Sequence, residues 1–496
     1  MFYICFLFIS IYYYLKIIKS IKYNKAILHC MFFMILLFSL SNIESIVTRN
    51  ILSIIFLFVI SCDFIITVFF ENEYGGRFNY SFALSIIETT NKEAKGMIDI
   101  YKKYFILFFC FYFFCIFTVN INFYKVSPFF GFIFLFFFFS FFVIKEYIHS
   151  IRKNNIENKF VRVLNYFPFS NLNPFLQAFL DKKKISEISR KIPKYNFKVE
   201  ENGNDIFILL IGESARPDNM SAYGYKRKTT PYLDDEKNKI LLNNVYSPAS
   251  VTATSVPISL SNAKVGDYKI SDYSDNVVNV ANSIGFKTYW FSNQGKHGDH
   301  SNAITGIAMN CDEKEWVSGF DENLLPLLDS ALSDQDRRKK FIVLHLYGSH
   351  VPCKERYPES SSFYKGECED DYYDNSIKYT DYLIFEILNR IKERNGSLIY
   401  FSDHGLERIN DNGDIIYKHG GVNSSKEAFK IPMFIYNPVS VCEMGEFTNK
   451  IWLTENNYQL IKKWFGIRDD INISELFFEN SVMVMDTTGK IKIIEV

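Results

Sequence analysis

The chain begins with long apolar segments, each about as long as a membrane span. A helix needs roughly 17–25 mostly apolar residues to cross a bilayer. Five segments approach that length: 2–18, 27–45, 51–70, 104–121 and 128–148. The first lacks the basic start and small-residue cleavage site of a signal peptide, so we interpret it as an anchor. The pattern therefore predicts an all-α transmembrane domain of about five helices over residues 1–150.

A polar segment, residues 71–103, separates the third apolar segment from the fourth. Ser85, Thr89 and Glu93 recur at every fourth position, which places them on one face of a helix. Such a helix can lie at the membrane surface, or the three residues can form the solvated face of a loop helix. The spacing leaves both interpretations open.

After a connecting segment over residues 151–204, the pattern changes to short apolar runs that alternate with helical stretches. This alternation predicts an α/β domain over residues 205–496 with a largely parallel central sheet. Strands are expected at 206–211, 287–292, 341–347, 398–401 and 432–436, and a helix at 374–394.

Polar or titratable residues follow four of the five expected strands. They are Glu213, Asn293, His350 and the pair Asp403 and His404. Because ligands of open α/β sheets bind beyond the carboxyl ends of the strands, we expect these residues to converge on one site. Glu213, Asp403 and His404 would form an O, O, N ligand set, which suits zinc and would also accept manganese. Three protein ligands leave a coordination position open for catalysis.

A nucleophile for such a site is available in the segment 247–257. It contains five hydroxyl groups, on Ser247, Ser250, Thr252, Thr254 and Ser255, and precedes an apolar helical pattern. A hydroxyl at a helix N-terminus lies where the dipole and the free N–H groups favour an alkoxide and a phosphate. Metal coordination would activate it by lowering its pKa. Composition does not choose among the five hydroxyls.

Composition narrows the class of protein further. Aromatic residues make up 18% of the chain, with 51 Phe, and the Phe residues crowd into the first 150 positions. Basic and acidic residues number 55 each, a balance that argues against nucleic-acid binding. Cys353 and Cys368 would close a loop of about 15 residues, and we expect them to form a disulfide. His345 lies within an apolar run and is expected in the core.

Motifs distributed over residues 205–440 follow one another in a specific order. They include Ile211-Gly212-Glu213-Ser214-Ala215-Arg216, Ser255-Val256-Pro257, Trp290-Phe291-Ser292-Asn293-Gln294, Gly348-Ser349-His350, Ser402-Asp403-His404-Gly405 and His419-Gly420. As a set they resemble the membrane-bound phosphoethanolamine transferases of the alkaline phosphatase/sulfatase superfamily. The five apolar segments and the segment 88–94 are also similar to this family.

The resemblance implies a reaction and a set of site residues. Phosphoethanolamine would pass from phosphatidylethanolamine, a membrane lipid, to an acceptor in the cell envelope through a phosphothreonine on Thr252. Zinc would be held by Glu213, Thr252, Asp403 and His404, while His350, His419, Asn293 and Lys296 would contact the phosphoryl group and Thr89 and Glu93 the donor lipid. The family resemblance also implies a multi-pass protein of the bacterial inner membrane with a sulfatase-like catalytic domain in the periplasm.

Departures from the family pattern leave the acceptor open. Leu406 stands where the family often has Glu, with Glu407 one position later, and the cysteines that bracket the nucleophile in lipid A-modifying members are absent. Lipid A or the core of lipopolysaccharide, another glycan or a protein are therefore all candidate acceptors. The alternatives are a phosphoglycerol transferase of the same superfamily or a non-catalytic membrane sensor. Lysines after the first apolar segment also conflict with a periplasmic catalytic domain under the positive-inside rule.

Overall fold

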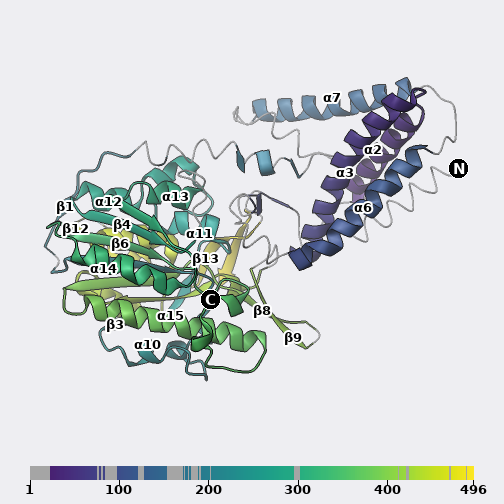
Figure 1. Ribbon diagram of the computed structural model, residues 1–496. Coiled ribbons are helices and arrows are strands. Elements are labelled where there is room, and N and C mark those ends of the chain that lie inside the picture. Colours follow the sequence, from purple (N-terminus) through teal and green to yellow (C-terminus); the bar gives the residue numbers. More distant parts are fainter. Residues whose placement is uncertain are drawn as a thin grey trace. The chain divides into compact units, whose positions relative to one another are not determined.

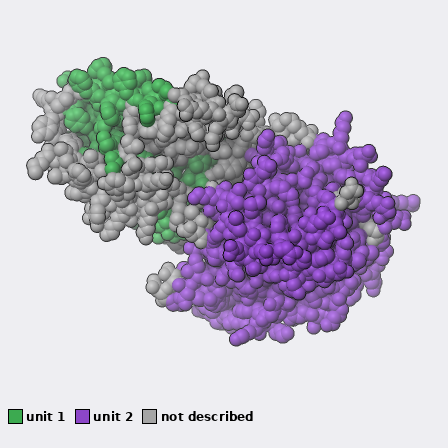
Figure 2. Space-filling model, turned by 180° about the vertical axis from the view of Figure 1, so that it is seen from behind, with its two compact units in different colours: residues 1–180 green, residues 181–496 purple. Residues whose placement is uncertain are grey.

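The computed structural model describes residues 23–74, 98–120, 128–152 and 192–496, apart from 202, 295–301, 412, 420–423, 469–470 and 488. It also describes a few isolated positions between 78 and 188. The chain forms two compact units, residues 1–180 and residues 181–496 (Figure 2). The boundaries expected at residues 150 and 204 stay predictions.

Four helices make up the described core of the first unit (Figure 1): α2 (Tyr23–Ser41), α3 (Ile46–Tyr74), α6 (Ile98–Asn120) and α7 (Phe129–Arg152). Apolar side chains of α2, α3 and α6 pack together, among them Leu40, Leu57 and Val119. Asp63 is buried on α3, and its carboxylate accepts a hydrogen bond of 2.9 Å from the backbone N–H of Asn171.

These helices meet the expectation of five spans only in part. Among the described residues, two stretches are long and apolar enough to cross a membrane, Ile46–Glu73 and Tyr101–Asn120, and a third, His29–Ser41, is shorter. The expected segment 2–18 lies outside the described residues. The segment 27–45 was expected to be one helix, but α2 ends at Ser41, where the side chain of Asn42 donates a hydrogen bond of 2.7 Å to the carbonyl of Phe38.

The second unit is built on an eight-stranded sheet, so the prediction of an α/β domain is confirmed. The strand order is β11-β3-β10-β7-β2-β6-β4-β5. The strands are β2 (Ile206–Gly212), β3 (Lys239–Tyr246), β4 (Lys287–Ser292), β5 (Glu313–Trp316), β6 (Lys340–His345), β7 (Gly396–Ser402), β10 (Lys430–Tyr436) and β11 (Ile451–Leu453).

All five expected strands are present, and β7, β2, β6, β4 and β5 run parallel. The expected strand at 432–436, which is β10, runs antiparallel to both of its neighbours. Its direction follows from the preceding hairpin, β8 (Glu407–Asp411) with β9 (Asp414–Lys418). The hairpin returns the chain to the edge where β7 ended, as the 3.0 Å hydrogen bond from Gly405 N–H to the Ala428 carbonyl shows.

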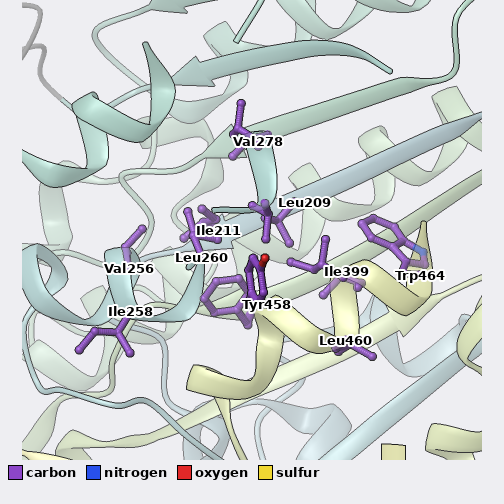
Figure 3. Packing of buried hydrophobic residues seen from close by; sticks show 14 of the residues in the cluster. Leu209, Ile211, Val256, Ile258, Leu260, Val278, Ile399, Tyr458, Leu460 and Trp464 are labelled. Carbon is purple, nitrogen blue, oxygen red and sulfur yellow. The ribbon is translucent and has the colours of Figure 1, made fainter. Parts of the chain in front are cut away.

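Helices cover both faces of the sheet (Figure 1). On one face Leu209 and Ile211 of β2 pack against helices α11 and α16 (Figure 3). On the other, Ile208 and Leu210 pack against helices α14 and α15. Successive side chains of a strand point to opposite faces, so a strand covered on both sides is apolar throughout. The helices are α10 (Pro231–Asp235), α11 (Thr252–Ser259), α12 (Val277–Ser283), α13 (Ala303–Ala308), α14 (Leu325–Ser333), α15 (Glu369–Ile391) and α16 (Asn457–Trp464).

The remaining elements are short. Two-stranded sheets pair β1 (Lys198–Val199) with β12 (Ile467–Arg468) and β13 (Ser481–Met485) with β14 (Ile491–Glu495). Turns of 3₁₀ helix lie at Pro217–Asn219, Ser221–Tyr223, Ile270–Ser274, Asp321–Leu324, Cys353–Glu355, Glu359–Ser361, Lys426–Ala428, Val439–Phe447, Thr454–Asn456 and Ile473–Leu476.

Candidate active site

The carboxyl ends of β2 and β7 bring three of the expected ligand residues together. Gly212 and Ser402 are register partners at the ends of these parallel strands, so the residues that follow them, Glu213 and Asp403, are neighbours. Glu213, Asp403 and His404 are all buried, and their ligand atoms lie within 4.8 Å of one another. We call these three residues the Glu-Asp-His cluster. His404 Nε2 lies 3.3 Å from Glu213 Oε1 and 3.3 Å from Asp403 Oδ2.

Thr252, the first residue of α11, faces the cluster. Its Oγ1 lies 3.1 Å from Glu213 Oε2 and 3.3 Å from His404 Nε2. The other candidate hydroxyls are placed differently: Ser247 donates to the Ala249 carbonyl, Ser255 donates to the Asp403 carbonyl, and Ser250 and Thr254 are buried. The geometry therefore distinguishes Thr252 among the five hydroxyls that the composition left equivalent.

The loops that carry the cluster are held by backbone contacts. Asp403 Oδ1 accepts hydrogen bonds from the backbone N–H groups of Ser214 and His404, at 2.9 and 2.7 Å. The loop after β6 lies so close that a Cβ on Gly348 would sit 2.8 Å from the backbone of Glu213. The φ of Gly348 is +52°, in the left-handed region, so both space and backbone conformation require glycine there.

A hydrogen bond through Nδ1 fixes the orientation of the His404 ring. Nδ1 lies 2.8 Å from the Gly405 carbonyl, an acceptor, so Nδ1 carries a hydrogen and donates it. Nε2 is then the nitrogen that faces the carboxylates and Thr252. A histidine held by a carbonyl through one ring nitrogen and free to coordinate through the other is the usual arrangement at a metal site.

The electrostatics of the cluster favour a cation. Burial and the adjacent charge of Glu213 raise the pKa of Asp403 to about 8. Burial alone would lower the pKa of His404, but Asp403 and Glu213 raise it to about 9. Burial disfavours the ionised form of Glu213, yet His404 holds its pKa well below the ordinary value. Among the described residues, the buried Oδ2 atom of Asp403 has no hydrogen-bond partner. An orphaned carboxylate oxygen, a second carboxylate and an imidazole fit a divalent cation.

Two further histidines lie beside the cluster. The ring of His419 is centred 4.8 Å from that of His404 and 5.4 Å from that of His350. Burial, with the nearby His404 and His350, lowers the pKa of His419 well below its ordinary value. His350 Nδ1 lies 2.7 Å from the Val351 carbonyl. Both expected histidines thus stand next to the cluster.

The turn after β4 carries Asn293, whose expected contact with the phosphoryl group stays a prediction. The side chain of Asn293 donates to Asp321 Oδ1 and to the Gly319 carbonyl, at 2.8 and 3.0 Å. The next residue, Gln294, reaches the cluster and donates to Glu213 Oε2 at 2.9 Å. Sequence reasoning missed Gln294; its place two residues beyond the strand end was the available signal. Lys296, Thr89 and Glu93, also expected to bind substrate, lie outside the described residues.

The position after Asp403-His404-Gly405 carries no carboxylate toward the cluster. Leu406 is fully buried in an apolar group with Ala215 and Tyr373. Glu407 accepts a hydrogen bond from the backbone N–H of Ser425 at 2.5 Å. The role that the family gives to Glu at this position is therefore not assigned to either residue.

The expected disulfide between Cys353 and Cys368 is wrong, because both cysteines are free. Cys353 is buried beside Tyr373 and Ile377, and Cys368 is exposed just before α15. The prediction rested on the short separation of the two cysteines along the chain. In the structure the side chain of Cys353 is buried, whereas that of Cys368 is exposed. The expectation for His345 is confirmed: its side chain is only 2% exposed, and burial lowers its pKa to about 4.

Two known protein families match different parts of the chain. The Sulfatase family matches residues 205–441, and the family described as "Transferase YhbX N-terminal domain" matches residues 1–189. The protein described as "Putative transferase YhbX" from Escherichia coli O157:H7 is 36% identical over 450 residues, which cover 88% of this chain and 83% of that protein. Phosphoethanolamine transferase EptC from Escherichia coli O18:K1:H7 (strain RS218 / NMEC) is 29% identical over 285 residues, 51% of this chain and 49% of that protein.

Two solved structures share the fold. The integral membrane protein lipooligosaccharide phosphoethanolamine transferase A from Neisseria meningitidis superposes with a TM-score of 0.62 at 17% identity, covering 93% of this chain and 95% of that one. The C-terminal periplasmic domain of EptC from Escherichia coli, in complex with Zn, superposes with a TM-score of 0.54 at 23% identity, covering 62% and 96%.

The sulfatase-like fold and the matching relatives define a transferase of the alkaline phosphatase/sulfatase superfamily. The resemblance to the phosphoethanolamine transferases, first seen in the motifs, is confirmed by the named relatives. Within this group the chain belongs to the YhbX transferase family.

Proposed function

We propose that the protein transfers phosphoethanolamine from phosphatidylethanolamine to an acceptor in the cell envelope, with Thr252 as the nucleophile. One observation carries the proposal: Thr252 Oγ1 lies within 3.3 Å of both Glu213 and His404. The names of the relatives support phosphoethanolamine as the transferred group. An activated threonine at a helix N-terminus suits phosphoryl transfer, because backbone N–H groups are available there for phosphate oxygens.

The proposed cofactor is zinc, held by Glu213, Asp403, His404 and Thr252. The buried O, O, N donor set supports this choice, as does the Zn complex of the structurally similar EptC domain. Bound zinc would neutralise negative charge on the nucleophile and on the phosphoryl group. The neighbouring imidazoles, His350 and His419, are assigned to the phosphoryl oxygens.

The reaction divides into two displacements. In the first, Thr252 Oγ1 loses its hydrogen, which it directs at Glu213 Oε2 in the structure, and forms a bond to phosphorus as the bond to the glycerol oxygen breaks. Diacylglycerol takes up the proton that Thr252 lost and stays in the bilayer. In the second, an acceptor hydroxyl attacks phosphorus as the bond to Thr252 breaks, and the threonine takes up the proton that the acceptor loses.

The reaction has several candidate acceptors and one alternative donor lipid. Lipid A, the lipopolysaccharide core, another glycan or a protein can each supply the accepting hydroxyl. A phosphoglycerol transferase would use the same threonine and metal with phosphatidylglycerol. Mass spectrometry of envelope glycans, lipids and proteins from cells with and without the protein identifies the transferred group and its acceptor.

The covalent intermediate gives a direct test. After the full chain is incubated with phosphatidylethanolamine and no acceptor, peptide mass spectrometry should find phosphoethanolamine on Thr252. Incubation with phosphatidylglycerol serves as the matched control and should leave this peptide unmodified. An adduct on Ser250 or Thr254, or a phosphoglycerol adduct on Thr252, would contradict the corresponding part of the proposal.

We also propose that five spans place the second unit in the periplasm. The two candidate spans and the fold shared with an integral membrane protein support a membrane domain. A reporter enzyme that is active only in the periplasm, fused after Val496, should then be active in cells. A fluorescent reporter that folds only in the cytoplasm, fused at the same place, is the control. Signal from the cytoplasmic reporter alone would contradict the proposed orientation.

A further inference from the structure

The turn after β4 is held rigidly beside the Glu-Asp-His cluster. Asn293 N–H donates to the His345 carbonyl at 2.9 Å, and the Asn293 side chain donates to Asp321 at 2.8 Å. The Ser292 hydroxyl lies 3.2 Å from His345 Nδ1. Ser292, Asn293 and His345 are all buried. The turn therefore offers a fixed base for the side chain of the next residue, Gln294.

The amide of Gln294 connects this turn to the cluster. Its Nε2 donates two hydrogen bonds of 2.9 Å, one to Glu213 Oε2 and one to the carbonyl of Leu346. Both partners are acceptors, which determines which end of the amide faces the cluster. Both hydrogens of the amide group are thus used, and the side chain has no freedom to turn without losing a bond.

Besides His404, which lies 3.3 Å from Oε1, neutral donors contact both oxygens of the Glu213 carboxylate. Oε1 accepts from the Ser214 hydroxyl at 2.6 Å, while Oε2 accepts from Thr252 at 3.1 Å and from Gln294 at 2.9 Å. Thr252 is the proposed nucleophile and gives up its hydrogen in the reaction. Among the described residues, Gln294 is then the donor that remains on Oε2, and it adds no charge to a buried site.

We propose that Gln294 is a positioning residue that holds the carboxylate of Glu213 for metal binding. It acts through Glu213 and has no direct contact with the metal. The inference rests on the metal site of the proposed function and adds a residue outside the four proposed ligands. Residues that hydrogen-bond to the ligands of a metal, and so orient them, typically contribute about 10- to 100-fold to metal affinity or activity.

The test measures zinc binding by the purified full chain, separately from activity. Gln294→Met keeps the length of the side chain and removes both N–H donors; Gln294→Ala removes the side chain as well. Competition with a chromophoric chelator should show about 10- to 100-fold weaker zinc affinity for both variants. The matched control is Gln335→Ala, which removes an exposed amide whose partner among the described residues is the nearby Ser333 carbonyl, and it should keep wild-type affinity.

Thermal unfolding of the metal-free proteins separates positioning from a structural role. We expect the unfolding midpoint of Gln294→Met without metal to match that of the wild type, with the difference appearing only when zinc is added. A lowered midpoint with unchanged zinc affinity would overturn the proposal, as would wild-type affinity in both variants. A wild-type chain that binds no zinc would instead overturn the proposed metal site itself.

Discussion

Thr252→Ala should reduce phosphoethanolamine transfer by at least about 10⁴-fold, the size of effect seen when a hydrolase loses its activated nucleophile. The substitution removes the hydroxyl that faces Glu213 and His404 and, with it, the proposed site of the covalent intermediate. The side chain is small and only half-buried, so the fold should be retained. Transfer is measured with purified chain, phosphatidylethanolamine and envelope extract, and far-ultraviolet circular dichroism checks the fold.

The matched control for this experiment is Thr254→Ala, the same substitution two residues further along α11. Thr254 is buried and has no described contact with the cluster, so this variant should keep substantial activity. Thr252→Ser, which keeps a hydroxyl at the same position, should retain part of the transfer. Unimpaired turnover by Thr252→Ala would show that another hydroxyl is the nucleophile.

Substitution of a residue of the Glu-Asp-His cluster should prevent metal binding and abolish transfer activity. His404→Ala removes the imidazole nitrogen that faces both carboxylates, and Asp403→Asn keeps the shape of the side chain while removing its charge. Because each variant leaves at most two charged or nitrogen ligands, zinc content should fall from near one equivalent to a small fraction of it. Elemental analysis by mass spectrometry after dialysis measures the loss.

Asp235→Asn provides the control for the charge change, since Asp235 is exposed at the end of α10. Its zinc content and transfer rate should equal those of the wild type. Full zinc content in both His404→Ala and Asp403→Asn would mean that the metal, if bound, lies elsewhere. Zinc loss accompanied by full transfer activity would separate the metal from the chemistry and contradict the proposed mechanism.

The sequence by itself predicted the class of fold and named Glu213, Asp403 and His404 as candidate ligands, which the structure brings together. Apolar runs of strand length alternate with helical stretches, which is a local property of the chain, and they matched β2, β4, β6, β7 and β10. Glu213 and Asp403 follow two of these runs directly. Because parallel strands end at one edge of a sheet, their convergence with His404 followed from local pattern and general topology.

The family resemblance pointed to Thr252, but pattern and composition did not, and the tertiary structure shows which side chains face the cluster. The choice of Thr252 over four nearby hydroxyls depends on how α11 packs, and it shows in contacts with residues 39 and 152 positions away. The partners of Gln294 and Asn293, the direction of β10 and the separation of Cys353 from Cys368 depend in the same way on distant segments. Periodicity and composition describe residues that are neighbours along the chain. Contacts between distant segments depend on which strands pair and in which register, and only the folded chain supplies this information.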